Sequence, residues 1–331
     1  MPGIAILDLA AVVPSQRLGR DEMLAAHPGE ADRLGQTGYT SAAIEPRFTA
    51  GELALQAVRG LRYWADDRLR WLMHASIHDQ GMGVFWNPAA ALQAELGLPG
   101  ALPLALRQGC DGLLVAFDLA VRQLQANPGQ RALLVGSDRF AGTGFCRVTS
   151  DYGIVYGDGA AAVVLGQGPG LARVVAVHTV TDPGLASLHH NPGPDAFDVR
   201  AAKRQFLAEH GQHRLRNATR AALMALKQQM VGHLRPQALR HVLVPHLGRD
   251  LLRDNYFSVF EGAEPLCPLA LGLSLGHLGT TDQLVALHHL MASGAAKPGE
   301  QALLIGAGAG FSWTAVLLEL QAPPPPSPPF R

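Results

Sequence analysis

The sequence predicts an α/β protein made of two copies of one α/β unit. Segment 69–74 resembles segment 239–244, and segment 132–136 resembles segment 302–306, with the same separation of 170 positions in both cases. Each of these segments is a short apolar run that follows a helix-like stretch, which is the pattern of a helix leading into a strand. A repeat at one fixed offset is typical of a duplicated structural unit.

The elements follow from this pattern in chain order. Segment 1–7 lacks a basic region and a long apolar run, so we expect a first strand there and not a signal peptide. Helices are expected over 52–65 and 113–125 in the first copy, each ahead of one of the repeated strands. In the second copy the corresponding helices are expected over 217–230 and 283–293.

The composition is that of a large globular chain. Of its 331 residues 48% are hydrophobic and 16% are charged, so we expect an extensive core in two halves, 1–170 and 171–320, with a proline-rich flexible tail at 321–331. Basic and acidic residues number 27 each, which argues against a nucleic-acid partner. No apolar segment of membrane-spanning length is free of glycine, proline or charge, so no membrane partner is expected either.

One of the three cysteines stands out. Three widely spaced cysteines form neither a disulfide framework nor a zinc ligand set, so we expect a reducing cytoplasm, no metal, and packing roles for Cys146 and Cys267. Cys110 is different, because segment 107–112 runs directly into the apolar run 113–121. This places its thiol in the first turn of a core helix, where unpaired N–H groups and the helix dipole favour a thiolate. A small residue at a tight helix start would give the same pattern.

The repeat predicts what lies opposite this thiol. The position equivalent to Cys110 is Thr280, in the polar loop 275–283, so the two loops are expected to face each other across a pseudo-twofold axis. The strand that ends at 76–78 has its counterpart ending at His246. A histidine, a polar loop and a cysteine are therefore expected to meet near the middle of the molecule, where strand ends and helix starts form sites in α/β proteins.

Several motifs resemble one enzyme family. The chain resembles the thiolase superfamily, and specifically the ketoacyl synthase III type of condensing enzyme. The resemblance rests on four stretches spread through the chain: 37–39 followed by 49–57, Gln108-Gly109-Cys110 with its apolar helix, Tyr156-Gly157-Asp158-Gly159-Ala160 with the following strand, and the glycine-rich turn 306–313.

The resemblance implies a fold and a chemistry. It implies a thiolase fold, with two duplicated α/β halves in five αβαβα layers, and a homodimer or a heterodimer with a homologue. It implies that Cys110 is the nucleophile and that His246 is the family's histidine. The cysteine of such enzymes takes an acyl group from a CoA or phosphopantetheine thioester, which is a substrate, so no permanently bound cofactor is expected.

Two positions depart from the family pattern. Where the family has asparagine this chain has His277, and where it has a small residue five places later this chain has Asp282. A histidine can replace the asparagine if its N–H points at the same oxygen, which keeps a condensing enzyme with a Cys-His-His site as an alternative. An aspartate near His246 would orient the ring and stabilise its charged form, which is the arrangement of an acyltransferase. Asp282 as a helix cap and His277 as a loop residue are the structural alternatives.

We therefore expect an acyltransferase that acts through acyl-Cys110. The donor is an acyl-CoA or an acyl carrier protein, and the acceptor is a small molecule with a hydroxyl or an amine. His246 would deprotonate the acceptor while Asp282 holds its ring, and His277 would bind the substrate carbonyl or share the base role. The backbone N–H groups of Cys110 and Ala309 would form the oxyanion hole. A catalytically silent partner subunit of a homologous synthase is the remaining alternative.

Overall fold

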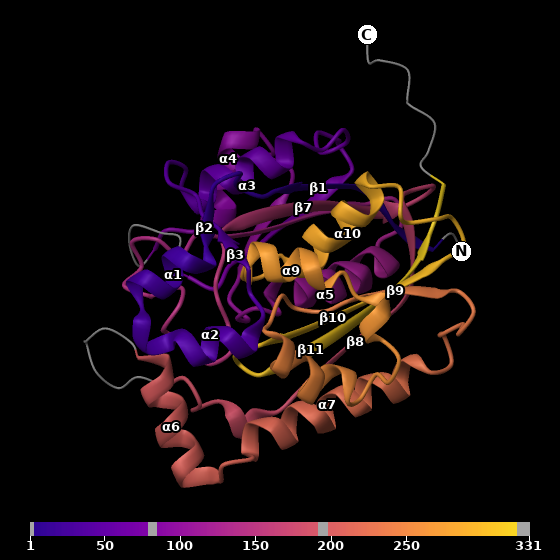
Figure 1. Cartoon of the computed structure of the whole chain (residues 1–331). Helices are drawn as coiled ribbons and strands as arrows, with labels where there is room; N and C mark the ends of the chain where they lie inside the picture. Colours follow the sequence, from indigo (N-terminus) through magenta and orange to yellow (C-terminus); the bar gives the residue numbers. More distant parts are fainter. Residues whose placement is uncertain (1–2, 79–84, 191–197, 323–331) are drawn as a thin grey trace.

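A computed structural model describes residues 3–78, 85–190 and 198–322 (Figure 1). Across these residues a nine-stranded mixed sheet runs in the order β5-β4-β6-β7-β1-β8-β11-β10-β9. A separate small sheet pairs β2 with β3. The strands are β1 (Ile4–Val12), β2 (Arg17–Gly19), β3 (Ser41–Ala43), β4 (Leu69–Ala75), β5 (Leu102–Leu106), β6 (Arg131–Asp138), β7 (Gly159–Gln167), β8 (Ala172–Thr181), β9 (Leu239–Leu243), β10 (Gln301–Gly308) and β11 (Ser312–Leu320).

The pairing of the strands confirms the duplication. In the first half β4 and β6 are parallel, and β6–β7 and β7–β1 are antiparallel. In the second half β9 and β10 are parallel, and β10–β11 and β11–β8 are antiparallel. The halves meet at a short antiparallel contact between β1 and β8, where Ala5 pairs with Arg173 and Ile6 with Ala172. Among the described residues the second half has no strand equivalent to β5.

The helices complete five layers (Figure 1). Helices α3 (Ala50–Arg59) and α4 (Pro88–Leu96) cover the outer face of the first half of the sheet. Helices α5 (Gly112–Ala126) and α10 (Asp282–Ala292) lie in the middle. The outer face of the second half carries α7 (Arg214–Met230), with α6 (Val199–His210) beside it.

The alternation of side chains along each strand explains why the sheet is covered on both faces. In β6, Ala132 and Leu134 pack into the central layer, while Leu133 and Val135 pack against α3 and α4. All four side chains are fully buried. Successive residues of a strand point to opposite faces, so an unbroken apolar run can fill two layers at once.

The predicted helix over 52–65 is too long, because α3 ends at Arg59. The backbone N–H of Gly60 closes the last turn, and the N–H of Arg62 then donates to the carboxylate of Asp8 in β1. This contact turns the chain toward the sheet. The other three predicted helices match α5, α7 and α10 within three residues at each end.

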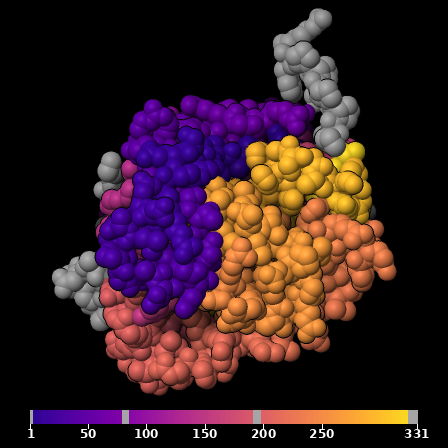
Figure 2. Space-filling model, viewed as in Figure 1, coloured from indigo at the N-terminus to yellow at the C-terminus, as the bar shows by residue number. Residues whose placement is uncertain are grey.

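The segment before α3 is hydrogen-bonded to the second half of the chain. The Tyr39 hydroxyl donates to the carbonyl of His246 at 2.6 Å, and the Thr40 N–H donates to the carbonyl of Leu273 at 2.8 Å. Figure 2 shows the N-terminal segment directly against the segment around residues 250–290. The elements here are α1 (Arg20–Ala26), α2 (Ala31–Thr37), α8 (Arg249–Leu251), the π-helix η3 (Leu252–Phe257) and α9 (Leu269–Leu275).

Within the described ranges, no helix is both long and apolar enough to cross a lipid bilayer. The tail predicted at 321–331 lies outside the described residues, apart from its first two positions.

Candidate active site

Cys110 lies in a tight loop between β5 and α5. Gly109 has a φ of +52°, a left-handed conformation that favours glycine, and it turns the chain just before the cysteine. The helix starts at Gly112, with Asp111 at the capping position. The expectation that Cys110 occupies the first helical turn is therefore wrong, since the thiol precedes the helix by two residues. The side chain is half-buried.

His277 is the ring next to this thiol. The Cys110 sulfur acts on the charge of this ring, and the ring's Nδ1 lies 2.5 Å from Oδ2 of Asp282. Because Nδ1 faces the carboxylate, Nε2 is the nitrogen left for the sulfur. The glycine before the histidine, Gly276, has a φ of +76° and reverses the chain after α9, which turns the ring inward. Cys110, His277 and Asp282 thus form a continuous line.

Asp282 does not cap the helix that it begins. Thr281 occupies the capping position, and Asp282 is the first residue of α10. Its carboxylate is fully buried and accepts the backbone N–H of Leu278 and of His246, both at 2.7 Å. The capping alternative is therefore wrong, because these contacts hold the two histidine-bearing loops together.

His246 lies on the other side of the same carboxylate. Its Nδ1 is 3.2 Å from Oδ1 of Asp282 and 3.2 Å from the carbonyl of Gly276. Its Nε2 is buried and makes no hydrogen bond to any residue that the structure describes. Asp282 is thus shared by both histidines, and its shorter contact is to His277.

The pKa values of the two histidine rings are shifted in opposite directions. Burial opposes the charged form of His277, but the Asp282 carboxylate and the Cys110 sulfur outweigh it and raise the pKa of His277 well above its ordinary value. For His246 burial is the stronger effect, and its pKa is lowered despite Asp282. Burial acts to raise the pKa of Asp282, yet His246 and His277 hold it below its ordinary value. The charged pair in the site is therefore Asp282 with His277.

The glycine-rich turn after β10 packs directly on the cysteine loop. A Cβ atom on Gly109 would lie 2.5 Å from the backbone N of Ala309, and one on Gly308 would lie 2.3 Å from the carbonyl oxygen of Gln108. Only glycine allows backbones to approach this closely. Ala309, predicted as an oxyanion donor together with Cys110, thus lies beside the residue that precedes the nucleophile.

The predicted facing of the two loops is also present. A Cβ atom on Gly112, at the start of α5, would lie 3.6 Å from the side chain of Thr280. Both helices of the central layer therefore start at the same place, one after Cys110 and the other after Thr280.

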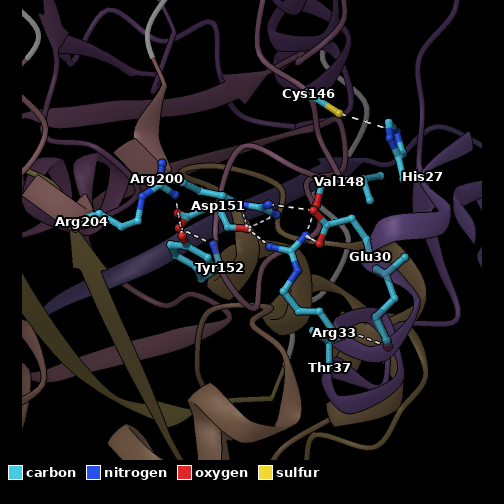
Figure 3. Close-up of polar contacts among 11 residues, drawn as sticks. His27, Glu30, Arg33, Thr37, Cys146, Val148, Asp151, Tyr152, Arg200 and Arg204 are labelled. Atoms are coloured by element: carbon cyan, nitrogen blue, oxygen red, sulfur yellow. Dashed lines mark hydrogen bonds and ion pairs between the residues drawn. The ribbon is translucent and has the colours of Figure 1, made fainter. Parts of the chain in front are cut away.

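Tyr156 is a neighbour of the site to which sequence reasoning gave no role. Its ring centroid is 5.3 Å from that of His277, and its hydroxyl donates to Oδ2 of Asp151 at 3.1 Å. Lys203 of α6 holds the other oxygen of Asp151 at 2.6 Å. Figure 3 shows Arg33 and Arg200 reaching the same turn, where both donate to the Asp151 carbonyl. The signal in the sequence was a tyrosine directly before the Gly-Asp-Gly-Ala motif.

Asp111 is a second residue that the sequence did not single out. It is fully buried, and its Oδ2 lies 2.8 Å from the hydroxyl of Ser312 and 2.8 Å from that of Thr314. Burial raises the pKa of Asp111 to about 7, against the effect of these two hydroxyls. The available signal in the sequence was the position of this aspartate, directly after Cys110 and ahead of the apolar run 113–121.

The other two cysteines lie apart from this line. Burial raises the pKa of Cys267 to about 12. Burial opposes ionisation of Cys146 as well, but hydrogen bonds from Thr149 and Val148 outweigh it and lower its pKa. The sulfur of Cys146 is 3.7 Å from His27 (Figure 3). Within the described part of the chain, no three His, Cys, Asp or Glu side chains converge on a metal site.

Comparison with known proteins identifies the family. Residues 104–183 match a family model described as 3-oxoacyl-[acyl-carrier-protein (ACP)] synthase III, and residues 234–320 match the model of its C-terminal part. The two matches cover about half of the chain and include Cys110, His246, His277 and Asp282. The chain belongs to the ketoacyl synthase III-like branch of the thiolase superfamily. The resemblance carried by the sequence motifs is thereby confirmed.

Individual relatives agree with this assignment. The mycobacterial beta-ketoacyl-[acyl-carrier-protein] synthase III of Mycolicibacterium paratuberculosis is 29% identical over 70% of this chain and 69% of its own length. The solved structure of ChlB3, described as an acyltransferase, superposes with a TM-score of 0.90 at 26% identity, over 97% of this chain and 99% of that one. The synthase III of Pseudomonas aeruginosa PAO1 superposes with a TM-score of 0.73 at 20% identity, over 98% and 100%. The thiolase fold is confirmed.

Proposed function

We propose that this family member is a thioester-dependent acyltransferase that moves an acyl group through acyl-Cys110 to a hydroxyl or amine acceptor. The observation that carries the proposal is the line from Cys110 to His277 to Asp282. A nucleophile, a base within hydrogen-bond reach and a carboxylate that orients the base are the parts of a triad. The likeness to ChlB3, described as an acyltransferase, supports the same reaction class.

Acylation begins with the Cys110 sulfur as a thiolate beside protonated His277. The sulfur attacks the carbonyl carbon of an acyl-CoA or acyl carrier protein thioester, and the oxyanion develops beside the backbone of Ala309. The bond from that carbon to the donor sulfur then breaks, and His277 gives its proton to the departing thiolate. The products of this step are acyl-Cys110, the free donor thiol and a neutral His277.

Transfer returns the site to its starting state. Neutral His277 takes the proton of the acceptor hydroxyl or amine, whose oxygen or nitrogen attacks the acyl carbon. The bond between that carbon and the Cys110 sulfur breaks, which releases an ester or an amide. The remaining thiolate again faces a protonated His277, and Asp282 stabilises the ring's charge in both steps.

This mechanism assigns the base role differently from the sequence-based expectation. His277 is the general base, because the Cys110 sulfur acts on its charge and its Nδ1 has the shorter contact to the Asp282 carboxylate. His246 remains neutral and buried, with Nε2 left to bind a substrate oxygen. Its contact to Asp282 makes it a positioning residue as well.

The first test is the covalent intermediate. The protein is incubated with acetyl-CoA, hexanoyl-CoA and benzoyl-CoA and weighed, and then ethanolamine is added, which offers both a hydroxyl and an amine. We expect an acyl adduct that is absent in Cys110→Ala and that is formed at least a hundredfold more slowly in His277→Gln. The absence of an adduct with every thioester, including one carried on an acyl carrier protein, would instead support the catalytically silent partner subunit.

Decarboxylative condensation is the second candidate. The buried Nε2 of His246 supports it, because this atom has no partner among the described residues and could hold the oxygen of an enolate. The relatives named beta-ketoacyl synthase III support it too. Malonyl-CoA separates the two reactions: carbon dioxide release and a β-ketoacyl product from acyl-Cys110 would favour condensation.

The pairing of two chains and the cellular compartment are also part of the proposal. β5 forms one edge of the sheet and exposes half of Leu102, which supports pairing with a second copy or a homologue across this edge. The three free cysteines support a reducing cytoplasm, where CoA and carrier-protein thioesters are available.

A further inference from the structure

A chain of side-chain oxygens runs from the residue after the nucleophile to the surface. Oδ2 of Asp111 is 2.8 Å from the hydroxyl of Thr314, which is 3.1 Å from the hydroxyl of Thr179. Thr179 in turn lies 2.9 Å from Oδ2 of Asp118, two turns further along α5. Asp118 pairs at 2.7 Å with Arg122, whose side chain is 63% exposed. The chain therefore connects the buried core of the site with solvent.

The number of hydrogen atoms along this chain shows whether both carboxyl groups can be ionised. It contains three oxygen–oxygen contacts, but the two threonines supply only two hydroxyl hydrogens. If Asp111 and Asp118 were both ionised, one contact would hold two oxygens together with no hydrogen between them. A proton on one carboxyl gives every contact a donor.

The surroundings decide which carboxyl holds the proton. Asp118 has a cation, Arg122, at its side. Asp111 is fully buried, and its Oδ1 has no hydrogen-bond partner among the described residues. That oxygen points at the backbone of Gly306, where a Cβ atom would lie 2.3 Å away. An unpaired buried carboxylate is costly, whereas a neutral carboxylic acid is tolerated in such a place.

We propose that Asp111 is a neutral carboxylic acid that donates its proton to Thr314 and so starts a hydrogen-bond chain through Thr179 to Asp118. The raised pKa of Asp111 agrees with this arrangement. Asp118 and the buried phenol of Tyr256 are ionisable groups in its field, and Cys110 is its neighbour in the chain. The Ser312 hydroxyl donates to the same carboxyl, so the acid also ties β11 to the cysteine loop.

The function of a neutral Asp111 rests on the proposed acyl transfer. In the proposed acylation, negative charge is carried first by the Cys110 thiolate and then by the oxyanion beside Ala309. An ionised neighbour in a dry site would repel both charges, whereas a neutral acid would not. Asp111 is therefore a positioning residue whose protonation state limits acylation at alkaline pH.

Infrared spectroscopy tests the protonation state without any need for acyl transfer. The difference spectrum of the whole protein between pH 6 and pH 9 should contain the C=O band of a carboxylic acid that is missing from Asp111→Asn. Other buried acids, such as Asp138, whose pKa burial raises to about 7, contribute equally to both proteins and cancel. The absence of a band that depends on Asp111 would overturn the proposal.

A second variant tests the direction of the chain. Thr314→Val keeps the size of the side chain but removes the oxygen that receives the Asp111 proton, so the band should disappear at a lower pH than in the wild type. If Asp111 were an anion that accepts the Thr314 hydrogen, the same change would shift the transition to higher pH and refute the proposal. Thr179→Val provides the same comparison should Thr314→Val not fold.

The effect on the reaction is read from the pH profile of acetyl-Cys110 formation from acetyl-CoA. We expect the ratio of the Asp111→Asn rate to the wild-type rate to rise about tenfold from pH 6 to pH 9, the effect of one pKa unit. A constant ratio would refute the electrostatic role. If the infrared band depends on Asp111 but neither the wild type nor any variant is acetylated, the neutral acid is established and only the proposed function is refuted.

Discussion

Replacing Asp282 by asparagine removes the charge on which the site depends while keeping the size of the side chain. The carboxylate accepts four contacts: 2.5 Å from Nδ1 of His277, 2.7 Å from the N–H groups of Leu278 and His246, and 3.2 Å from Nδ1 of His246. An amide has only one oxygen, so its NH2 group must face one pair of these donors. The ring of His277 then loses its charge partner and its fixed orientation.

The size of the loss follows from the role of the carboxylate. In a Ser-His-Asp triad the change of aspartate to asparagine lowers kcat by roughly 10⁴-fold, because the histidine adopts the wrong tautomer. The short contact from Asp282 to His277 is of the same kind, so we expect acyl transfer in Asp282→Asn to fall by about 10³–10⁴-fold. This is ~4–5.5 kcal/mol in the barrier.

The assay is the time course of acyl-Cys110, followed by rapid mixing with acyl-CoA and intact mass. Both its formation and its discharge to ethanolamine should slow, because His277 takes part in both. Asp158→Asn is the matched control, since Asp158 is an equally buried carboxylate whose partners are the guanidinium of Arg147 and the N–H groups of Glu45 and Phe140, and it pairs with neither His246 nor His277. Transfer by Asp282→Asn within tenfold of the wild-type rate, with the control unchanged, would refute the triad.

Four further outcomes are expected. In Gly308→Ala a Cβ atom would meet the Gln108 carbonyl, so kcat should fall by about 10²–10³-fold with a small change in KM; an unaffected kcat would argue against an oxyanion role for this turn. Leu134→Ala should lower the free energy of unfolding by ~2–5 kcal/mol in urea titrations, because the side chain is fully buried. Iodoacetamide at pH 8 should label Cys267 last, as its pKa of about 12 keeps it a thiol; early labelling in peptide mass spectra would contradict this. Asp111 binds its proton more tightly in the folded protein than in the unfolded chain. The free energy of unfolding of the wild type should therefore fall relative to that of Asp111→Asn as the pH rises from about 4 to 7, by roughly 4 kcal/mol in total. A difference between the two proteins that is the same at both pH values would exclude a raised pKa.

The fold was accessible from the sequence because its signals are periodic and repeated. The apolar runs around Leu134 and Leu304 lie 170 positions apart, and both became strands next to the central layer. Burial on both faces keeps such runs continuous, so they are easily found. The length of α3 was not accessible, because Arg62 leaves the helix to reach Asp8, a contact 54 positions away in the chain.

The composition of the site was predicted better than its internal arrangement. Cys110, His246, His277 and Asp282 meet, but the sequence alone could not show which ring takes the closer carboxylate oxygen. That choice depends on the left-handed turn at Gly276, a local angle that a residue pattern does not report. Asp111 was missed for a related reason, since its burial depends on partners 201 and 203 positions away.

The junction between β1 and β8 has a consequence for how the molecule could be divided. The sulfur is supplied by one half of the chain and both imidazoles by the other, while β1 and β8 join the halves of the sheet through two residue pairs, Ala5 with Arg173 and Ile6 with Ala172. A cut in the turn after β7 should yield two fragments that are each inert. Activity would return only on mixing, so reconstitution of the split enzyme would report directly on the assembly of the interior helix layer.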